Sequence, residues 1–112
     1  MSKQPNNSKT KPTILIVEDD AATSKLLSHH LQKYGRVITT KNAREAIANN
    51  SVCNPDIIFL DVHYHDDIYD GFDVLRNILS TDKDAFVVMF SADNNPENSE
   101  KAIFIGAKGF IY

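Results

Sequence analysis

The sequence predicts an α/β protein in which one parallel β-sheet carries helices on both faces. Short apolar runs rich in β-branched residues recur along the chain, and such runs are typical of strands buried on both faces. Longer segments with apolar residues at helical spacing separate these runs. Strands that alternate with helices favour parallel pairing, and right-handed crossovers leave few topologies for such a chain.

The first two strands are expected at residues 13–17 (TILIV) and 36–40, on either side of the first helix. That helix is expected over residues 21–34, because a stripe at helical spacing carries most of its apolar side chains. The members of this stripe are Thr23, Leu26, Leu27, His30, Leu31 and Tyr34. His30 is therefore expected to be packed or to lie at the edge of the stripe, and Gly35 follows where a helix C-cap is expected.

Capping residues mark the remaining helices. Asn42 and Glu45 have the spacing of a capping box, which starts the second helix directly after Asn42. Gly71 precedes a third helix, and Pro96 stands at the first position of a fourth helix that Gly106 can close. The strands between and after these helices are expected at residues 57–60 (IIFL), 85–90 (AFVVMF) and 109–112.

Length, composition and charge exclude several classes of protein. The 112 residues suit one domain, and the hydrophobic share of 42% and charged share of 24% are ordinary for a soluble fold. No apolar run approaches the roughly 18 residues of a membrane span. Cys53 is the single cysteine, which fits a reducing compartment such as the cytoplasm. Residues 1–12 contribute +3 to a net charge of −3 and have the composition of a disordered tail, so residues 13–112 carry −6 and do not suggest nucleic-acid binding.

Acidic and hydroxyl side chains follow three of the apolar strands. Glu18 and Asp19 follow the first strand, Asp61 follows the third and Ser91 follows the fourth. Ligands of open α/β sheets bind beyond the carboxyl ends of the strands, and in the strand order 2-1-3-4-5 these three strands are neighbours. Clustered carboxylates repel one another unless a cation or proton lies among them, and hard oxygen ligands suit Mg²⁺. Asp20 is expected to be the N-cap of the first helix instead of a direct member of the site.

The runs ILIVEDD, PDIIFLD, VVMFSA and GAKGFIY, in this order, resemble the receiver domain of two-component response regulators. The resemblance covers residues 13–112 and implies a flavodoxin-like, doubly wound, five-stranded parallel sheet in the order 2-1-3-4-5. It implies that the protein is not an enzyme. It also implies that Asp61 accepts a phosphoryl group from a histidine kinase or phosphotransfer protein. Phosphorylation is then expected to change the contacts that the domain makes with a downstream partner or with a second copy of itself.

The resemblance also implies roles for other residues. Glu18 and Asp19 correspond to the acidic pair, with Asp19 the more direct Mg²⁺ ligand and Glu18 acting through water. The backbone carbonyl of His63 corresponds to a further metal ligand. Ser91 corresponds to the residue that hydrogen-bonds the phosphoryl group, and Phe110 to the aromatic switch position.

The sequence departs from the family pattern at its C-terminus. The chain ends at Tyr112, directly before the expected position of the family lysine and of a fifth helix. We therefore expect a receiver domain over residues 13–112 that is truncated, with Lys108 a solvated loop residue that does not replace the lysine. Such a chain would be a piece of a longer regulator, or a short receiver whose open apolar face is covered by a partner or a second copy.

The loop after Asp61 is also unusual, because Gly71 comes two residues later than the corresponding glycine of the family. This loop is expected to be solvated, and a second metal site is disfavoured because nothing fixes the geometry of its ligands. Tyr64 and Tyr69 could either cover the site or contact a partner. The residues that would supply the second metal site are His63, His65, Asp66 and Asp67.

Three other functions compete with phosphoryl transfer onto a switching receiver. A pseudo-receiver that binds a protein without switching would explain the missing lysine and the altered loop. A phosphatase of the dehalogenase type is disfavoured, because His63 occupies the position at which that family needs an aspartate. A flavin-binding flavodoxin is disfavoured too, because the acidic residues after the first strand would repel a phosphate.

Overall fold

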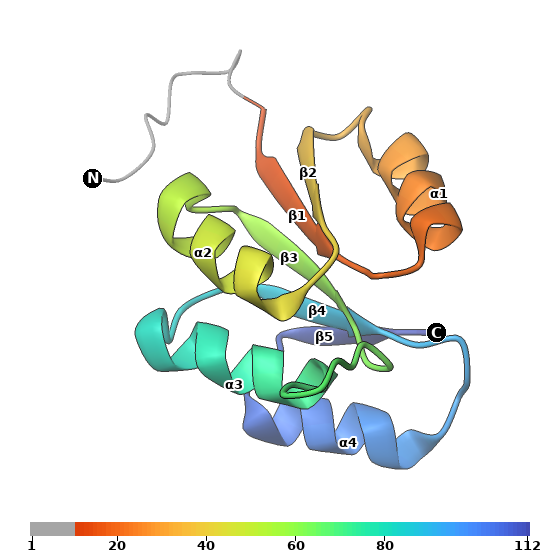
Figure 1. The fold of residues 1–112 in the computed structure, drawn as a ribbon. Helices are drawn as coiled ribbons and strands as arrows, with labels where there is room; N and C mark the ends of the chain where they lie inside the picture. The colour runs from red at the N-terminus through yellow and green to blue at the C-terminus, as the bar shows by residue number, and fades with distance from the viewer. Residues whose placement is uncertain (1–10) are drawn as a thin grey trace.

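The computed structural model describes residues 11–112, so the disordered tail predicted for residues 1–12 lies almost entirely outside the described residues. Strands and helices alternate along the chain (Figure 1). The strands pair in parallel in the order β2-β1-β3-β4-β5, which confirms the predicted fold class. The elements are β1 (Thr13–Val17), α1 (Ala21–Leu31), β2 (Arg36–Thr40), α2 (Ala43–Cys53), β3 (Ile57–Asp61), α3 (Gly71–Thr81), β4 (Val87–Phe90), α4 (Pro96–Ile105) and β5 (Gly109–Ile111).

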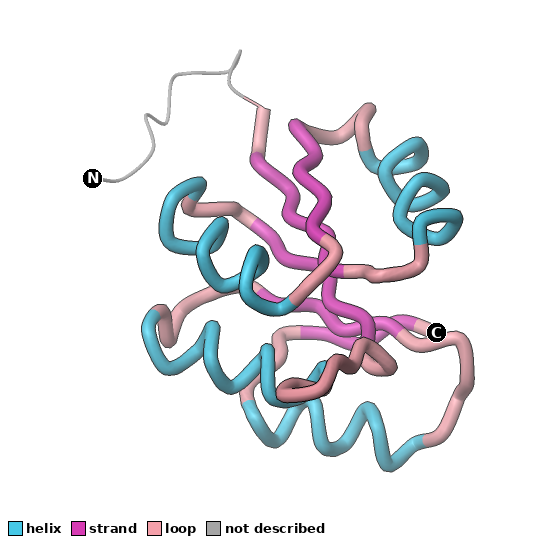
Figure 2. The backbone as a smooth tube through the Cα atoms, in the orientation of Figure 1, coloured by secondary structure: helices cyan, strands magenta, loops and turns pink. Residues whose placement is uncertain are grey.

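The helices form two layers around the sheet. α1 lies on one face, and α2, α3 and α4 lie side by side on the other (Figures 1 and 2). The main hydrophobic core fills the space between the sheet and the three-helix layer, and alternate residues of the central strands enter it. Burying each large aliphatic side chain contributes about 1.5–3 kcal/mol to folding. Core side chains from the central strands include Leu15, Val17, Ile58, Leu60, Val87 and Met89.

Local capping positions three helices largely as the sequence predicts. Each cap side chain accepts a backbone N–H in the first turn of its helix, and Gly106 ends α4 with a positive φ of 136°. The capping box predicted at Asn42 is incomplete, because the Glu45 carboxylate accepts the N–H of Lys41 instead of that of Asn42. The residues that cap α1, α2 and α4 are Asp20, Asn42 and Asn95.

Helix α1 differs from its prediction. It ends at Leu31 with Gln32 as its C-cap, so the predicted end at residue 34 and the predicted cap at Gly35 are wrong. Gly35 is buried, and the position favours glycine for a reason other than capping: a Cβ there would lie 2.4 Å from the carbonyl oxygen of Pro12. Half of the predicted apolar stripe is exposed, because α1 covers only β1 and β2 and has no neighbouring helix on its face in the described chain. The exposed members of the stripe are Leu26, His30 and Tyr34.

None of the helices in the described part of the chain is long and apolar enough to cross a membrane.

Candidate functional site

Three carboxylates meet at the carboxyl ends of two neighbouring strands. Glu18 and Asp19 follow β1 directly, and Asp61 is the last residue of β3, which pairs in register with β1. One oxygen from each carboxylate lies within 4.8 Å of the others. Within residues 11–112, no second group of acidic, histidine or cysteine side chains converges in this way. The structure therefore brings together the three side chains that the sequence places at these strand ends.

Glu18 is the buried member of this cluster, with 4% of its surface exposed. Burial raises the pKa of Glu18 to about 7, and the nearby Asp61 carboxylate adds to this rise. The backbone N–H of Asp20, which donates to the Glu18 carboxylate at 3.0 Å, acts in the opposite direction. A buried carboxylate beside two others is stabilised by a proton or by a cation bound among them. The three oxygens are hard donors of the kind that Mg²⁺ prefers, so the residues fit a divalent cation.

Ser91 lies on the next strand end, directly after β4, and is buried. Its Oγ lies 3.0 Å from Nε2 of His63 and accepts the backbone N–H of Asp93 at 3.1 Å. The same His63 nitrogen lies 2.8 Å from Oδ2 of Asp93. The backbone N–H of His63 donates to Oδ1 of Asp61 at 2.9 Å. His63 therefore joins the loop that follows the candidate phosphoacceptor to the loop that follows Ser91.

The contacts of His63 exclude one catalytic arrangement. In a serine–histidine–acid relay, the serine and the acid contact different ring nitrogens. Here Ser91 and Asp93 approach the same nitrogen, so His63 cannot take a proton from the serine while the acid orients its other face.

Sequence reasoning missed Asp93 and the side-chain role of His63. The available signal was their position, because each stands two residues after a strand-end residue of the site. The pKa of the Asp93 carboxyl is held below its usual range, first by the backbone N–H of Asn95 and then by His63. Asp93 is therefore an ionised acceptor for the His63 ring.

The loop after β3 is exposed over most of its length, as expected, and the four residues considered for a second metal site do not converge; only Val62 and Tyr64 are buried in it. Tyr64 is 2% exposed, so it neither covers the site nor offers itself to a partner. Its hydroxyl accepts the N–H of Ala43 at 2.7 Å and donates to Asp66 at 2.6 Å. Asp66 in turn accepts the N–H groups of Ile68 and Tyr69, and Tyr69 is half-buried against the core. Burial raises the pKa of Tyr64 to about 12, so its hydroxyl keeps its proton.

Tyr64→Phe is expected to lower the free energy of unfolding by about 1–3 kcal/mol. The substitution keeps the buried ring but leaves the Ala43 N–H, at the start of α2, without its acceptor. Urea unfolding followed by circular dichroism measures the change. Tyr69→Phe is the matched control, with an expected change below about 0.5 kcal/mol. A loss below about 0.5 kcal/mol in Tyr64→Phe, as expected for the control, would show that the Tyr64 hydroxyl contributes little.

Phe110 lies on β5, the strand that pairs with β4, and Ser91 directly follows β4. Its ring is half-buried against the core and makes an edge contact with Tyr112, with the ring centroids 5.8 Å apart. The backbone joins it to the site, because the N–H of Ser91 donates to the carbonyl of Ile111 at 3.0 Å. Lys108, at the start of the strand, is exposed as expected.

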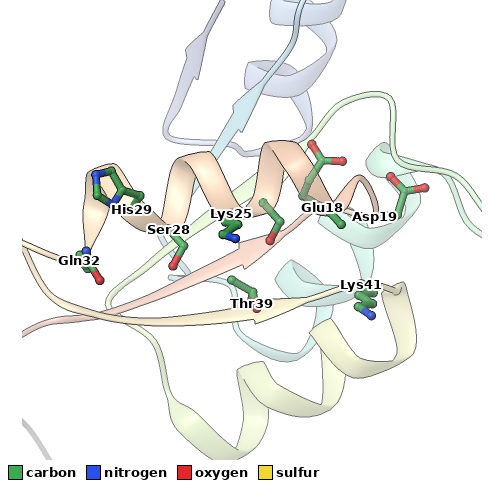
Figure 3. A pocket seen from close by; sticks show the side chains of 10 residues that line it. Glu18, Asp19, Lys25, Ser28, His29, Gln32, Thr39 and Lys41 are labelled. Carbon is green, nitrogen blue, oxygen red and sulfur yellow. The ribbon is translucent and has the colours of Figure 1, made fainter.

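A polar groove of about 490 Å³ runs beside the carboxylate cluster, between α1 and β2. Figure 3 shows Glu18 and Asp19 at one end of the groove and His29 and Gln32 at the other. The groove makes the cluster accessible from solvent along α1. The other residues that line it are Ala21, Ser24, Lys25, Ser28, Thr39 and Lys41.

The fold and the site together define a flavodoxin-like α/β protein with a carboxylate cluster at the point where its strand order reverses. The sequence model of the response regulator receiver domain matches residues 14–112. The chain belongs to this family, which confirms the resemblance of its four motifs.

Known relatives show the same relationship in sequence. The chain is 34% identical over 99 residues to the nitrogen assimilation regulatory protein NtrX of Azorhizobium caulinodans, a match that covers 88% of this chain and 22% of the relative. It is 30% identical over 100 residues to the chemotaxis protein CheY of Thermotoga maritima, covering 88% of this chain and 82% of the relative. The chain thus spans a small part of NtrX and most of CheY.

Solved structures show the same relationship in fold. NtrX from Brucella abortus superposes with a TM-score of 0.84 at 29% identity, over 91% of this chain and 23% of that one. CheY4 of Vibrio cholerae superposes with a TM-score of 0.81 at 25% identity, over 90% of this chain and 85% of that one.

Proposed function

We propose that this receiver domain accepts a phosphoryl group on Asp61, from a histidine kinase or a phosphotransfer protein, with Mg²⁺ bound in the carboxylate cluster. The observation that carries the proposal is the convergence of Glu18, Asp19 and Asp61, whose oxygens lie within 4.8 Å of one another. The phosphorylated domain would signal through altered contacts with a downstream protein or a second copy, as a cytoplasmic, non-enzymatic module.

The chemistry of the site supports this assignment. In the transfer, an Asp61 oxygen attacks phosphorus and the bond between phosphorus and the donor's histidine nitrogen breaks. Asp61 must be ionised for this attack, and its N–H contact with His63 orients the carboxylate. Glu18, Asp19, Asp61 and the His63 carbonyl would hold Mg²⁺, which offsets their repulsion and neutralises charge on the phosphoryl oxygens. Ser91 is placed to hydrogen-bond the phosphoryl group, and Phe110 would then adjust its packing on β5.

A non-switching pseudo-receiver is the second candidate. The observation that favours it is the contact between the Ser91 hydroxyl and His63, since a hydroxyl already held by a side chain is not free for a phosphoryl group. Such a protein would keep the fold and bind a partner without covalent modification.

The two candidates are separated by incubation with acetyl phosphate and Mg²⁺, followed by intact-mass measurement. We expect a gain of one phosphoryl group that disappears when a chelator removes Mg²⁺. A gain that chelation leaves unchanged would contradict the assigned role of the carboxylate cluster. The absence of any gain, together with unchanged amide spectra on adding Mg²⁺ and beryllofluoride, would favour the pseudo-receiver.

A further inference from the structure

The charged residues of the domain are distributed unevenly along the chain. Residues 21–44, which form α1, β2 and the start of α2, contain no acidic residue and carry +5. Their basic residues are Lys25, Lys33, Arg36, Lys41 and Arg44. Because residues 13–112 together carry −6, the rest of the domain carries −11. A basic surface on an otherwise acidic domain attracts an acidic partner and fixes its orientation.

The polar groove between α1 and β2 concentrates part of this positive charge. The α1 residues that line it recur at spacings of three and four, so they form one face of the helix, and none has a large apolar side chain. Lys25 comes from this face, and Thr39 and Lys41 come from the opposite side of the groove (Figure 3). Arg44 does not contribute, because it lines a separate hollow beside two aspartates. The α1 face consists of Ala21, Ser24, Lys25, Ser28, His29 and Gln32.

β2 offers a free edge beside this groove. It is the outermost strand of the sheet and pairs with β1 alone in the described chain. The N–H of Arg36 and the carbonyl of Thr40 bond toward the β1 side, at 2.8 and 3.1 Å. Backbone groups alternate in direction along a strand, so those of Val37 and Thr39 point toward the open edge. An extended chain can pair with such an edge as an added strand.

We propose that this edge and groove bind an acidic, extended segment of a partner protein. The segment adds to β2 as a further strand and places carboxylates beside Lys25 and Lys41. The inference does not depend on phosphorylation of Asp61.

The size and chemistry of the groove support a peptide as its occupant. The 11 residues of α1 span about 16 Å, which is the length of about five extended residues. Sites for small molecules are mostly apolar, whereas large apolar side chains do not line this groove. A nucleic acid would be repelled by the charge of −11 on the rest of the domain.

The test measures binding of the whole chain, without Mg²⁺, to a labelled peptide of about ten residues in which Glu alternates with Thr. Fluorescence anisotropy gives the Kd. The double substitution Lys25→Gln and Lys41→Gln is expected to weaken binding about tenfold, the combined effect of two exposed ion pairs. The matched control is Lys83→Gln with Lys108→Gln, which removes the same charge from exposed lysines outside the groove. It should keep the Kd within about twofold of the wild type.

Modified peptides test the two parts of the proposal separately. A peptide with Gln at each Glu position should lose most of the affinity, because it lacks the carboxylates. N-methylation of the Glu amides and N-methylation of the Thr amides place methyl groups on opposite edges of the added strand. Only the modification that faces β2 should weaken binding, by about tenfold.

Four results would overturn the inference. They are the absence of binding, equal affinities for the Glu and Gln peptides, equal losses in the groove and control variants, and N-methylated peptides that both bind as tightly as the unmodified one. Tighter binding of a single-stranded oligonucleotide of equal charge would also overturn it, since the occupant would then be a nucleic acid. A chain that binds the peptide but takes up no phosphoryl group would overturn the proposed function and support this inference.

Discussion

Asp61→Asn is expected to abolish phosphoryl uptake from acetyl phosphate while leaving the fold intact. The carboxamide has the shape of the carboxylate but is neutral and is a far weaker nucleophile. Removing the nucleophile of a covalent step costs roughly 10³-fold or more in rate, so intact-mass measurement should show no gain. The chain should also become more stable by up to about 1 kcal/mol, because Asp61 is one source of the raised pKa of Glu18.

Asp67→Asn is the matched control for this experiment. Asp67 is an exposed carboxylate of the same loop and is not part of the converging cluster. It should gain one phosphoryl group as readily as the wild type. If Asp61→Asn still gained the phosphoryl mass, the acceptor would be another residue, and peptide mapping would locate it.

The fold could be predicted because buried parallel strands leave a simple signal. Each central strand needs apolar side chains on both faces, which gives a continuous apolar run in the sequence. Residues 13–17 are such a run, and they form β1 with the predicted bounds. Helix α1 was harder to predict. Its stripe at helical spacing does not show how much of that stripe a neighbour covers, and Leu26 is 58% exposed although the pattern suggests burial.

The carboxylate cluster could be predicted for a topological reason. Residues that follow neighbouring parallel strands must lie at one edge of the sheet, whatever the loops do. The contacts of the loops are different. His63 meets Ser91 across 28 residues and Asp93 across 30, and Tyr64 meets Ala43 across 21. These pairs depend on how each loop packs against the finished core, and no local pattern in the sequence encodes that path.

Gly71→Ala is a change outside the cluster that is expected to affect both the stability of the fold and the binding of Mg²⁺. Gly71 is the buried first residue of α3, where alanine would ordinarily stabilise a helix by up to about 1 kcal/mol relative to glycine. Here a Cβ would lie 2.5 Å from the carbonyl oxygen of Asp61 and 2.7 Å from that of Val62. These are backbone atoms that no rotamer change can move, so either α3 or the end of β3 must shift.

Gly71→Ala should therefore lower the free energy of unfolding by about 1–3 kcal/mol and also weaken Mg²⁺ binding, because the displaced carbonyl belongs to Asp61 itself. Urea unfolding gives the first quantity and calorimetric titration with Mg²⁺ gives the second. Gly109→Ala is the matched control, since its Cβ would meet only the two methyl groups of Val88, at 3.7 and 3.9 Å, which are ordinary van der Waals contacts. Equal stability and equal Mg²⁺ affinity in the two variants would show that the approach of α3 to β3 does not position the carboxylate.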